Sequence, residues 1–415
     1  MFGAKVKPLF EFIQGIFFAL LAWLVIAPIV FLIPKDKRLI AVIGKDGGDF
    51  LDNCKYFYLQ SQQHLTDKQK CLFVTNQEEI FKTLQNENLP VINYPSFIGA
   101  YFLLRANIVM VDSFEWFKQL RFFLTLGAKK VQLWHGVGFK QIELGRQNLA
   151  HDFSITRSLL YRVQIYYRNI IGRNVFYHVV NTTSNFYKKE VFESAFSAKY
   201  FTTFGYPRNA FDHSKDDMIN TDSFIFSQME TWLADDKNII LFVPTFREHR
   251  DTPLGLNSEN IKLINKWCEA MNSIIIFKFH PWENSISHIK SPFIFQYNSR
   301  KDVYPLFPYL DTMISDYSSI YMDFLLLNKP IFFLIPDKQQ YLDQDRQIQF
   351  NYDEMTPGAK AESWQQLLKV MEQQLDNDQF KTAREQLCLK AFDSNVQNLA
   401  TRKILDFFRA KQWLV

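Results

Sequence analysis

Two histidines in this sequence stand directly after short apolar runs of the kind that form buried strands. His135 follows residues 131–134 and precedes Gly136, and His280 follows residues 273–279. An imidazole has an ordinary pKa of about 6.5, so His135 can take a proton from a hydroxyl group at neutral pH. The alternative for His135 is a structural histidine that caps a turn. His280 has the chemistry to hydrogen-bond a bridging or leaving phosphate oxygen.

Hydroxyl and cationic side chains follow two further apolar runs. Thr245 and Arg247 come after residues 238–243, and Ser318 and Ser319 lie in a polar turn before an apolar helix pattern. The start of such a helix presents free N–H groups, and its dipole favours an anion. A guanidinium group binds phosphate through two parallel hydrogen bonds. These four side chains therefore predict a binding site for a phosphate group.

Two more cationic side chains and a glycine-rich loop lie in predicted loops or turns. Lys140 ends the glycine-containing stretch that begins after His135, and Arg208 lies in the turn at 204–209. Arg208 can pair with a phosphate or form a salt bridge across a hinge between domains. The loop at 44–49 lacks the spacing of a dinucleotide or ATP fingerprint. Its glycines either make a tight turn or allow a substrate to approach closely.

Apolar runs of strand length alternate with windows of helix length along the chain. The expected strands lie at 39–43, 71–75, 90–94, 108–112, 131–134, 176–181, 238–244, 273–279, 293–297, 312–315 and 331–335. Helix windows include 114–126, and two longer windows at 361–375 and 379–408 close the chain. Such alternation predicts parallel sheets covered by helices on both faces. Ligands of such sheets bind outside the carboxyl ends of the strands, where the polar residues named above stand.

The predicted fold class is α/β, with two doubly wound, Rossmann-like domains and an N-terminal apolar membrane segment. We expect a membrane-anchoring segment at 1–38, a first domain at 39–210 and a hinge region at 211–236. The second domain is expected at 237–390. A C-terminal helix within 391–415 is expected to pack back on the first domain.

The membrane segment is predicted from an apolar run of eighteen uncharged residues at 16–33. At about 1.5 Å per residue, this run is just long enough to cross or enter a bilayer. Lys5 and Lys7 precede it and a denser basic cluster at 35–38 follows it, which favours a cytoplasmic location for the rest of the chain. A buried core helix is the alternative. Pro28 also permits a kinked segment that enters and leaves one leaflet.

The composition limits the class of protein. The chain has 415 residues, of which 47% are apolar and 22% charged, and its formal net charge is +4. These values are typical of a folded chain of two or three domains and do not favour nucleic-acid binding. The four cysteines lie far apart, no H-E-x-x-H or G-x-S-x-G motif occurs, and neither a metal site nor a cofactor is predicted. A requirement for a divalent cation is left open.

The polar motifs, taken in order, resemble those of the CDP-glycerol glycerophosphotransferase family, which includes wall teichoic acid primases and polymerases and related capsule enzymes. The resemblance covers roughly residues 130–360 and departs from the family at Val137 and Gly138, where Thr-Pro is usual. The motifs that carry it are Trp134-His135-Gly136 with Lys140, Gly205-Tyr206-Pro207-Arg208-Asn209, Pro244-Thr245-Phe246-Arg247, His280-Pro281 and Asp316-Tyr317-Ser318-Ser319.

The resemblance implies a GT-B architecture, in which an acceptor domain at 39–210 and a nucleotide-binding domain at 237–390 face a cleft. His135 is the implied base, which would deprotonate an acceptor hydroxyl that attacks the β-phosphorus of a CDP-polyol, with CMP leaving. Asp316 would either hold its turn or help to orient the polyol. The implied diphosphate-binding and substrate-binding residues are His280, which counts as catalytic, with Arg247, Thr245, Ser318, Ser319, Lys140 and Arg208.

The resemblance also implies partners and a location. The donor would be CDP-glycerol or CDP-ribitol, with glycerol phosphate favoured. The acceptor would be carried on a polyprenyl diphosphate, at the cytoplasmic face of the bacterial cell membrane and in contact with its lipid. Two other functions remain as alternatives: a GT-B glycosyltransferase that uses a sugar nucleotide, and a non-catalytic, membrane-tethered nucleotide-binding assembly protein. The number of units added is left open.

Overall fold

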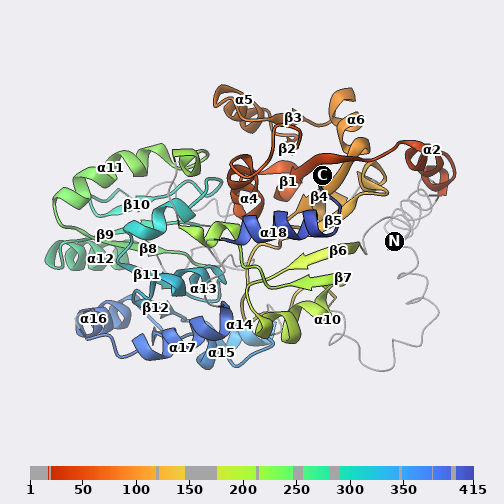
Figure 1. The fold of residues 1–415 in the computed structure, drawn as a ribbon. Helices are drawn as coiled ribbons and strands as arrows, with labels where there is room; N and C mark the ends of the chain where they lie inside the picture. The colour runs from red at the N-terminus through yellow and green to blue at the C-terminus, as the bar shows by residue number, and fades with distance from the viewer. Residues whose placement is uncertain are drawn as a thin grey trace, which may run out of the picture. The chain divides into compact units, whose positions relative to one another are not determined.

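The computed structural model describes residues 17, 20–117, 121–144, 175–211, 215–245, 256–279, 290–344, 348–375, 377–393 and 399–415. The chain forms two compact units. Unit 1 contains the described residues of 1–135, 142–210 and 395–415, and unit 2 those of 136–141 and 211–394. Each unit has its own β-sheet, whose strands are labelled in Figure 1.

The sheet of unit 1 has seven strands in the order β3-β2-β1-β4-β5-β6-β7, and neighbouring strands pair in parallel. The strands are β1 (Asp36–Ile43), β2 (Lys70–Thr75), β3 (Val91–Asn93), β4 (Ala106–Val111), β5 (Lys129–Gln132), β6 (Phe176–Asn181) and β7 (Ser197–Thr202). Every residue of the central strand β4 is buried. A continuous apolar strand of this kind requires cover on both faces of the sheet.

The helices of unit 1 begin where the sequence supplies local signals. Ser96 caps α6, because its Oγ accepts a hydrogen bond from Gly99 N at 2.9 Å. The helix α18 buries an apolar face, and Thr401 in it donates to Gln60 of α4 at 2.5 Å. The longer helices are α4 (Asp52–Gln62), α5 (Glu78–Asn86), α6 (Phe97–Arg105) and α18 (Ala400–Ala410), and the short ones are α3 (Lys45–Gly48), α9 (Asn185–Tyr187) and α10 (Glu193–Ala195).

The sheet of unit 2 has six parallel strands in the order β10-β9-β8-β11-β12-β13. They are β8 (Asn238–Phe242), β9 (Ser273–Phe277), β10 (Ile294–Gln296), β11 (Thr312–Ser315), β12 (Ile331–Leu334) and β13 (Ala359–Ala361). The helices are α11 (Ser223–Ala234), α12 (Ser258–Ala270), α13 (Ile320–Phe324), α14 (Lys338–Gln344), α15 (Tyr352–Met355), α16 (Trp364–Gln374) and α17 (Lys381–Ala391).

One face of this second sheet is packed by aromatic rings. Trp364 of α16 lies edge-on to Phe242 at 5.2 Å between ring centroids and parallel to Phe277 at 6.2 Å. Trp267 of α12 belongs to the same buried cluster. Each such side chain contributes roughly 1.5–3 kcal/mol when it is fully buried. The cluster therefore fixes the strands whose carboxyl ends carry the polar residues of unit 2.

The apolar N-terminal run forms a π-helical turn, η1 (Ala22–Ile26), followed by α2 (Ala27–Leu32). No helix in the described part of the chain is long and apolar enough to cross a membrane. Of the expected segment at 16–33, residues 16, 18 and 19 lie outside the described residues. Trp23 packs against Phe123, with ring centroids 5.1 Å apart.

The predicted fold class of two Rossmann-like α/β sheets is confirmed, and two helix windows need correction. The window 114–126 instead contains two 3-10 turns, η2 (Glu115–Phe117) and η3 (Arg121–Thr125), because its bulky rings pack into the core. The window 379–408 contains two helices, α17 and α18, which belong to different units. The segment 211–236, where we expected a hinge, contains α11 and belongs to unit 2.

Candidate active site

Three polar side chains of unit 1 follow neighbouring strands at the same edge of the sheet. Lys45 comes after β1, Asp112 directly after β4, and His135 after β5. The register places Ile43 opposite Val111, and Val111 opposite Gln132. The carboxyl ends of these strands are therefore level, and the three side chains stand at the edge where parallel sheets bind ligands.

The imidazole of His135 is held in one tautomer. Its Nδ1 lies 3.0 Å from the main-chain carbonyl oxygen of Asp112. A carbonyl can only accept, so Nδ1 carries the hydrogen and Nε2 keeps its lone pair. The ring also stacks on Trp134, with centroids 4.1 Å apart. The lone pair of Nε2 is the group that can take a proton from a substrate hydroxyl.

The imidazole is also kept neutral. Burial, followed by the nearby charge of Lys45, lowers the pKa of His135 to about 4. The carboxylate of Asp52 and the hydrogen bond to Asp112 oppose this shift but do not cancel it. At neutral pH, His135 is therefore a free base, as proton abstraction requires.

The turn before His135 is strained and clamped. Trp134 has a φ of 59°, a region that a bulky buried residue rarely adopts. Asn53, at the start of α4, donates through Nδ2 to the carbonyl oxygen of Trp134 at 2.7 Å. Its Oδ1 accepts from Arg208 N at 3.4 Å. A fully buried amide thus joins the strained turn to the Arg208 turn, and this clamp fixes the direction of the His135 ring.

Arg208 pairs with a carboxylate within unit 1. Its Nη1 lies 2.5 Å from Asp52 Oδ1, and its side chain is almost fully buried. Both partners belong to the same unit, and the binding of a phosphate by Arg208 stays a prediction. The charge of Arg208 adds to the effects that lower the pKa of His135.

Asp112 places a buried carboxyl group at this edge. Its carboxyl group is fully buried, and neither oxygen has a hydrogen-bond partner of normal geometry among the described residues. Burial, followed by repulsion from Asp52, raises its pKa well above the ordinary value. Sequence reasoning missed Asp112 because it stood at the end of the predicted strand 108–112. Asn53 and Asp52 gave no local signal at all.

In unit 2, Asp316 organises the two predicted phosphate-binding loops. Its fully buried carboxylate accepts hydrogen bonds from Thr245 N at 3.0 and 2.9 Å and from Thr245 Oγ1 at 2.7 Å. It also accepts from Ser318 N at 3.1 Å and from Tyr317 N. With these donors around it, Asp316 ties the loop after β8 to the turn after β11. This geometry fits the role of holding the turn.

The hydroxyl side chains of this edge are arranged around that carboxylate. Thr245, Ser318 and Ser319 are all partly exposed. Ser319 stands immediately before α13, and its side chain makes no capping hydrogen bond there. The hydroxyl groups of Ser318 and Ser319 thus stand after the carboxyl end of β11, whereas that of Thr245, after β8, donates to Asp316.

The segment 136–141, which follows His135 in the chain, belongs to unit 2. A Cβ atom added to Gly138 would lie 3.0 Å from the Cβ of Ser319, so glycine permits a close approach. The carbonyl oxygen of Phe139 accepts from Gln349 N at 2.7 Å. Lys140 pairs with Ile348 through the main chain, and its Nζ lies 5.2 Å from the centroid of the Tyr341 ring.

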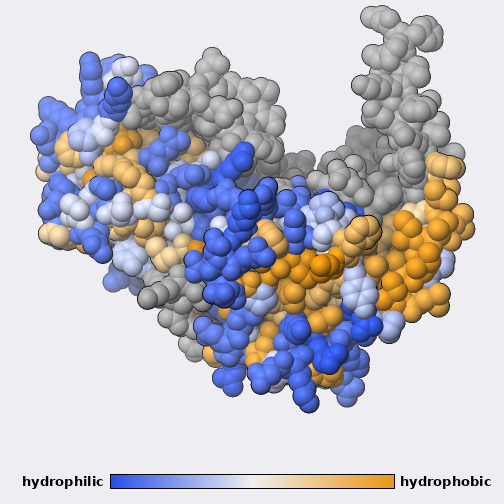
Figure 2. All heavy atoms as spheres, turned by 90° about the horizontal axis from the view of Figure 1, so that it is seen from above, coloured by the Kyte–Doolittle hydropathy of each residue, from blue (hydrophilic) through white to orange (hydrophobic). Residues whose placement is uncertain are grey.

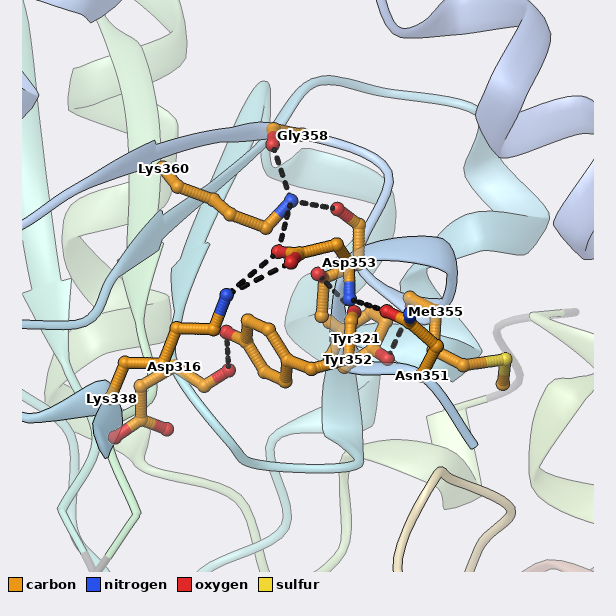
Figure 3. Close-up of polar contacts among 10 residues, drawn as sticks. Asp316, Tyr321, Lys338, Asn351, Tyr352, Asp353, Met355, Gly358 and Lys360 are labelled. Atoms are coloured by element: carbon orange, nitrogen blue, oxygen red, sulfur yellow. Dashed lines mark hydrogen bonds and ion pairs between the residues drawn. The ribbon is translucent and has the colours of Figure 1, made fainter. Parts of the chain in front are cut away.

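A group of charged residues lies beside the Asp316 turn (Figure 3). The hydroxyl of Tyr352 donates to the main-chain oxygen of Asp316 at 2.9 Å. The next residue, Asp353, accepts from Lys338 Nζ at 3.1 and 2.9 Å and lies 3.7 Å from Lys360 Nζ. Lys338 holds the pKa of Asp353 below its ordinary value, first through its hydrogen bonds. Sequence reasoning did not single out these two lysines.

Two predicted site residues, Arg247 and His280, lie outside the described residues. Their assigned contacts with a diphosphate therefore stay predictions. Within the described ranges, no group of three or more His, Cys, Asp or Glu side chains could hold a metal ion.

Two Rossmann-like units, each with polar side chains at the carboxyl edge of its sheet, place the chain in the class of two-domain α/β proteins that bind ligands at these edges. A family model narrows this class. Residues 25–408 match the model of CDP-Glycerol:Poly(glycerophosphate) glycerophosphotransferase, and the chain belongs to that family. It is an enzyme of the transferase class, as the sequence motifs predicted, from the family of teichoic acid polymerases and primases.

Several relatives match most of the chain. It is 24% identical over 355 residues to the teichoic acid poly(glycerol phosphate) polymerase of Bacillus spizizenii, covering 83% of this chain and 85% of the relative. It is 25% identical over 348 residues to the teichoic acid glycerol-phosphate transferase of Staphylococcus aureus, covering 81% and 84%. Against the teichoic acid poly(glycerol phosphate) polymerase of Bacillus subtilis, identity is 28% and the match spans only 37% of that protein.

A solved structure of the wall teichoic acid polymerase TagF shares the fold. The TM-score is 0.70 at 18% identity, and the match covers 97% of each chain. A second TagF structure, from a crystal soaked with CDPG, gives the same TM-score and identity. This likeness confirms the GT-B-like, two-sheet fold that the sequence predicted.

Proposed function

We propose that this enzyme transfers a polyol phosphate, with glycerol phosphate favoured, from a CDP-polyol to a hydroxyl group of a lipid-linked acceptor. CMP is the second product. The observation that carries the proposal is the neutral His135 with its Nε2 lone pair free at the carboxyl edge of unit 1. Family membership and the CDPG-soaked TagF structure support CDP-glycerol as the donor.

The base acts on the acceptor. Nε2 of His135 takes the hydroxyl proton as the acceptor oxygen attacks the β-phosphorus of the CDP-polyol. The bond between that phosphorus and the bridging oxygen breaks, and CMP leaves with the electron pair. The carbonyl of Asp112, 3.0 Å from Nδ1, stabilises the imidazolium that forms. Asn53 keeps the ring in the direction that this transfer needs.

The donor is assigned to unit 2. Ser318 and Ser319 hydrogen-bond the diphosphate through their hydroxyl groups. The hydroxyl of Thr245 already donates its hydrogen to Asp316, so Thr245 fixes its loop instead, and Asp316 holds both loops in place without touching the substrate. Arg247, His280 and Lys140 neutralise the charge that develops as CMP leaves. Such positioned donors supply most of the catalysis in phosphoryl transfer.

An exposed apolar surface supports the assignment of a lipid-linked acceptor and of contact with the membrane. Leu24, Ile29 and Leu32 of η1 and α2 are 76%, 57% and 83% exposed. Figure 2 shows hydrophobic residues gathered on the side of unit 1 where α2 lies. A patch of this kind marks a site of membrane or protein contact. We assign it to lipid at the cytoplasmic face of the bacterial cell membrane, in cell-envelope polymer synthesis, including capsule.

The function is tested by CMP release. Purified enzyme is given CDP-glycerol, CDP-ribitol or a UDP-sugar, each with a lipid-linked saccharide acceptor in anionic vesicles. We expect CMP from a CDP-polyol, a loss of about a hundredfold or more in kcat for His135→Ala, and an unchanged fold by circular dichroism. Turnover of the UDP-sugar alone would identify a glycosyltransferase, and tight CDP binding without any product would identify a non-catalytic protein.

Flotation of the protein with lipid vesicles tests the membrane assignment separately. The double variant Leu24→Glu with Leu32→Glu should no longer float with the vesicles, because charges replace the two most exposed apolar side chains of the segment. Unchanged flotation would reject this surface as the lipid contact.

A further inference from the structure

The segment 136–141 begins directly after the proposed base and is packed into unit 2. Every second side chain along it is buried: Val137, Phe139 and Gln141 have exposed fractions of 3%, 0% and 5%. The carbonyl oxygen of Phe139 accepts a hydrogen bond from Gln349 N at 2.7 Å. The segment is therefore a fixed part of unit 2 and not a loose connection.

The short helix α15 connects this segment to the turn of Asp316. The ring of Phe139 lies edge-on to that of Tyr352, with centroids 5.3 Å apart. The hydroxyl of Tyr352 donates to the main-chain oxygen of Asp316 at 2.9 Å (Figure 3). Tyr321, in the helix that follows the turn, donates through its hydroxyl to the main-chain oxygen of Met355 at 2.6 Å (Figure 3). The segment, α15 and the turn are thus packed as one body.

A second, direct contact joins the segment to the same turn at Gly138. A Cβ atom added to Gly138 would lie 3.0 Å from the Cβ of Ser319 and 3.9 Å from its Cα. Carbon atoms in favourable contact are about 3.5–4.0 Å apart. Rotation of the Ser319 side chain about χ1 does not move its Cβ, so it would not relieve this crowding. Glycine at position 138 is therefore what allows the segment to lie this close to Ser319.

The turn is the more firmly held side of this contact. The carboxyl group of Asp316 accepts hydrogen bonds from Ser318 N at 3.1 Å and from Thr245 N at 3.0 and 2.9 Å. A side chain at 138 would therefore displace the segment and leave the hydroxyl groups of the turn in place. Because the segment is joined directly to His135, its displacement would be passed to the base through the chain.

We propose that Gly138 is a positioning residue of the transfer reaction. Because it has no side chain, the segment that follows the base packs directly on the diphosphate-binding turn, and this packing sets the base for its reaction with the acceptor. The inference rests on the proposed function and deepens it by naming a residue that positions the base. Thr-Pro is usual in the family at positions 137 and 138, so the glycine contact with Ser319 distinguishes this chain.

The test is a cycle of substitutions at the two positions, with CMP release from CDP-glycerol as the assay. Gly138→Ala adds the Cβ atom that crowds Ser319, so kcat should fall by about tenfold while KM for CDP-glycerol stays within about twofold. The loss should be as large in a Ser319→Ala background, which keeps the Cβ atom of residue 319.

The matched background is Ser319→Gly, which lacks the same hydroxyl group but also lacks the Cβ atom. There, Gly138→Ala should lower kcat by less than about twofold, because the crowding is gone. Equal losses of kcat in all three backgrounds would overturn the proposal. A rise in KM with kcat unchanged would also overturn it, since Gly138 would then serve donor binding alone.

Two measurements without turnover separate this proposal from the proposed function. Gly138→Ala should lower Tm by about 2–4 °C in the wild-type and Ser319→Ala backgrounds, but not in Ser319→Gly. In calorimetry, CDP should bind Gly138→Ala with a Kd within about twofold of wild type, because the turn keeps its place. Absence of CMP from wild-type enzyme would reject the proposed function. An equal fall in Tm in every background, or much weaker CDP binding, would reject the role of Gly138.

Discussion

The carboxyl edges of the two sheets carry different chemical groups. At the edge of unit 1, His135 is oriented by a main-chain carbonyl, and burial raises the pKa of the neighbouring Asp112 well above its ordinary value. At the edge of unit 2, the carboxyl group of Asp316 accepts hydrogen bonds from main-chain and hydroxyl donors. A base works only while it is uncharged, whereas a diphosphate site needs rigidly presented donors. In the proposed function, proton transfer therefore belongs to unit 1 and charge stabilisation to unit 2.

The largest effect should come from Asp316→Asn. In either orientation of the new amide, its nitrogen would face the N–H group of Thr245, which now donates to both carboxylate oxygens. We expect a loss of about 2–4 kcal/mol in the free energy of unfolding and a rise of about tenfold or more in KM for CDP-glycerol. Thermal unfolding and initial rates measure both, with the exposed Asp235→Asn as control. Wild-type values for both would show that Asp316 does not organise the donor loops.

A smaller loss should follow Asn53→Asp. The aspartate keeps an acceptor for Arg208 N but loses the donor that holds the carbonyl oxygen of Trp134. Because the base is then free to turn, kcat should fall by about tenfold to a hundredfold, while KM for CDP-glycerol stays constant. Steady-state kinetics measure kcat and KM separately, and the exposed Asn86→Asp serves as the control. A change in KM alone would contradict the positioning role.

The smallest predicted effect is a dependence of the free energy of unfolding on pH. The pKa of His135 falls from 6.5 to about 4 on folding, so the unfolded chain binds more protons between these values. The contribution of His135 to the free energy of unfolding is therefore fully present above pH 6.5, and it should decrease as the pH falls toward 4. His178, with a pKa of about 4, contributes in the same direction. Urea unfolding across this range should show a shallower decrease for His135→Asn than for wild type, and equal slopes would contradict a neutral, buried base.

Local sequence patterns placed the residues that directly follow strands. His135, Thr245, Ser318 and Ser319 were predicted at strand ends, and the structure has them there. The rule succeeds because parallel strands bring their carboxyl ends to one edge, whatever the details of packing.

Local sequence patterns did not predict the contacts between residues that are far apart in the chain. The clamp of Asn53 on Trp134 joins positions 81 residues apart, and the pairing of Asp52 with Arg208 joins positions 156 apart. The last helix window was split because α17 and α18 bury their apolar faces in different units. Periodicity reveals that a face is apolar, but it does not reveal the surface that covers it.

The measurement that tests the account most directly is the mass of a lipid-linked acceptor after incubation with CDP-glycerol, compared with CDP-ribitol. The account predicts a gain of one or more whole glycerol phosphate units with wild-type enzyme and no gain with His135→Ala. A gain by the mass of a sugar, or an equal gain with His135→Ala, would contradict it.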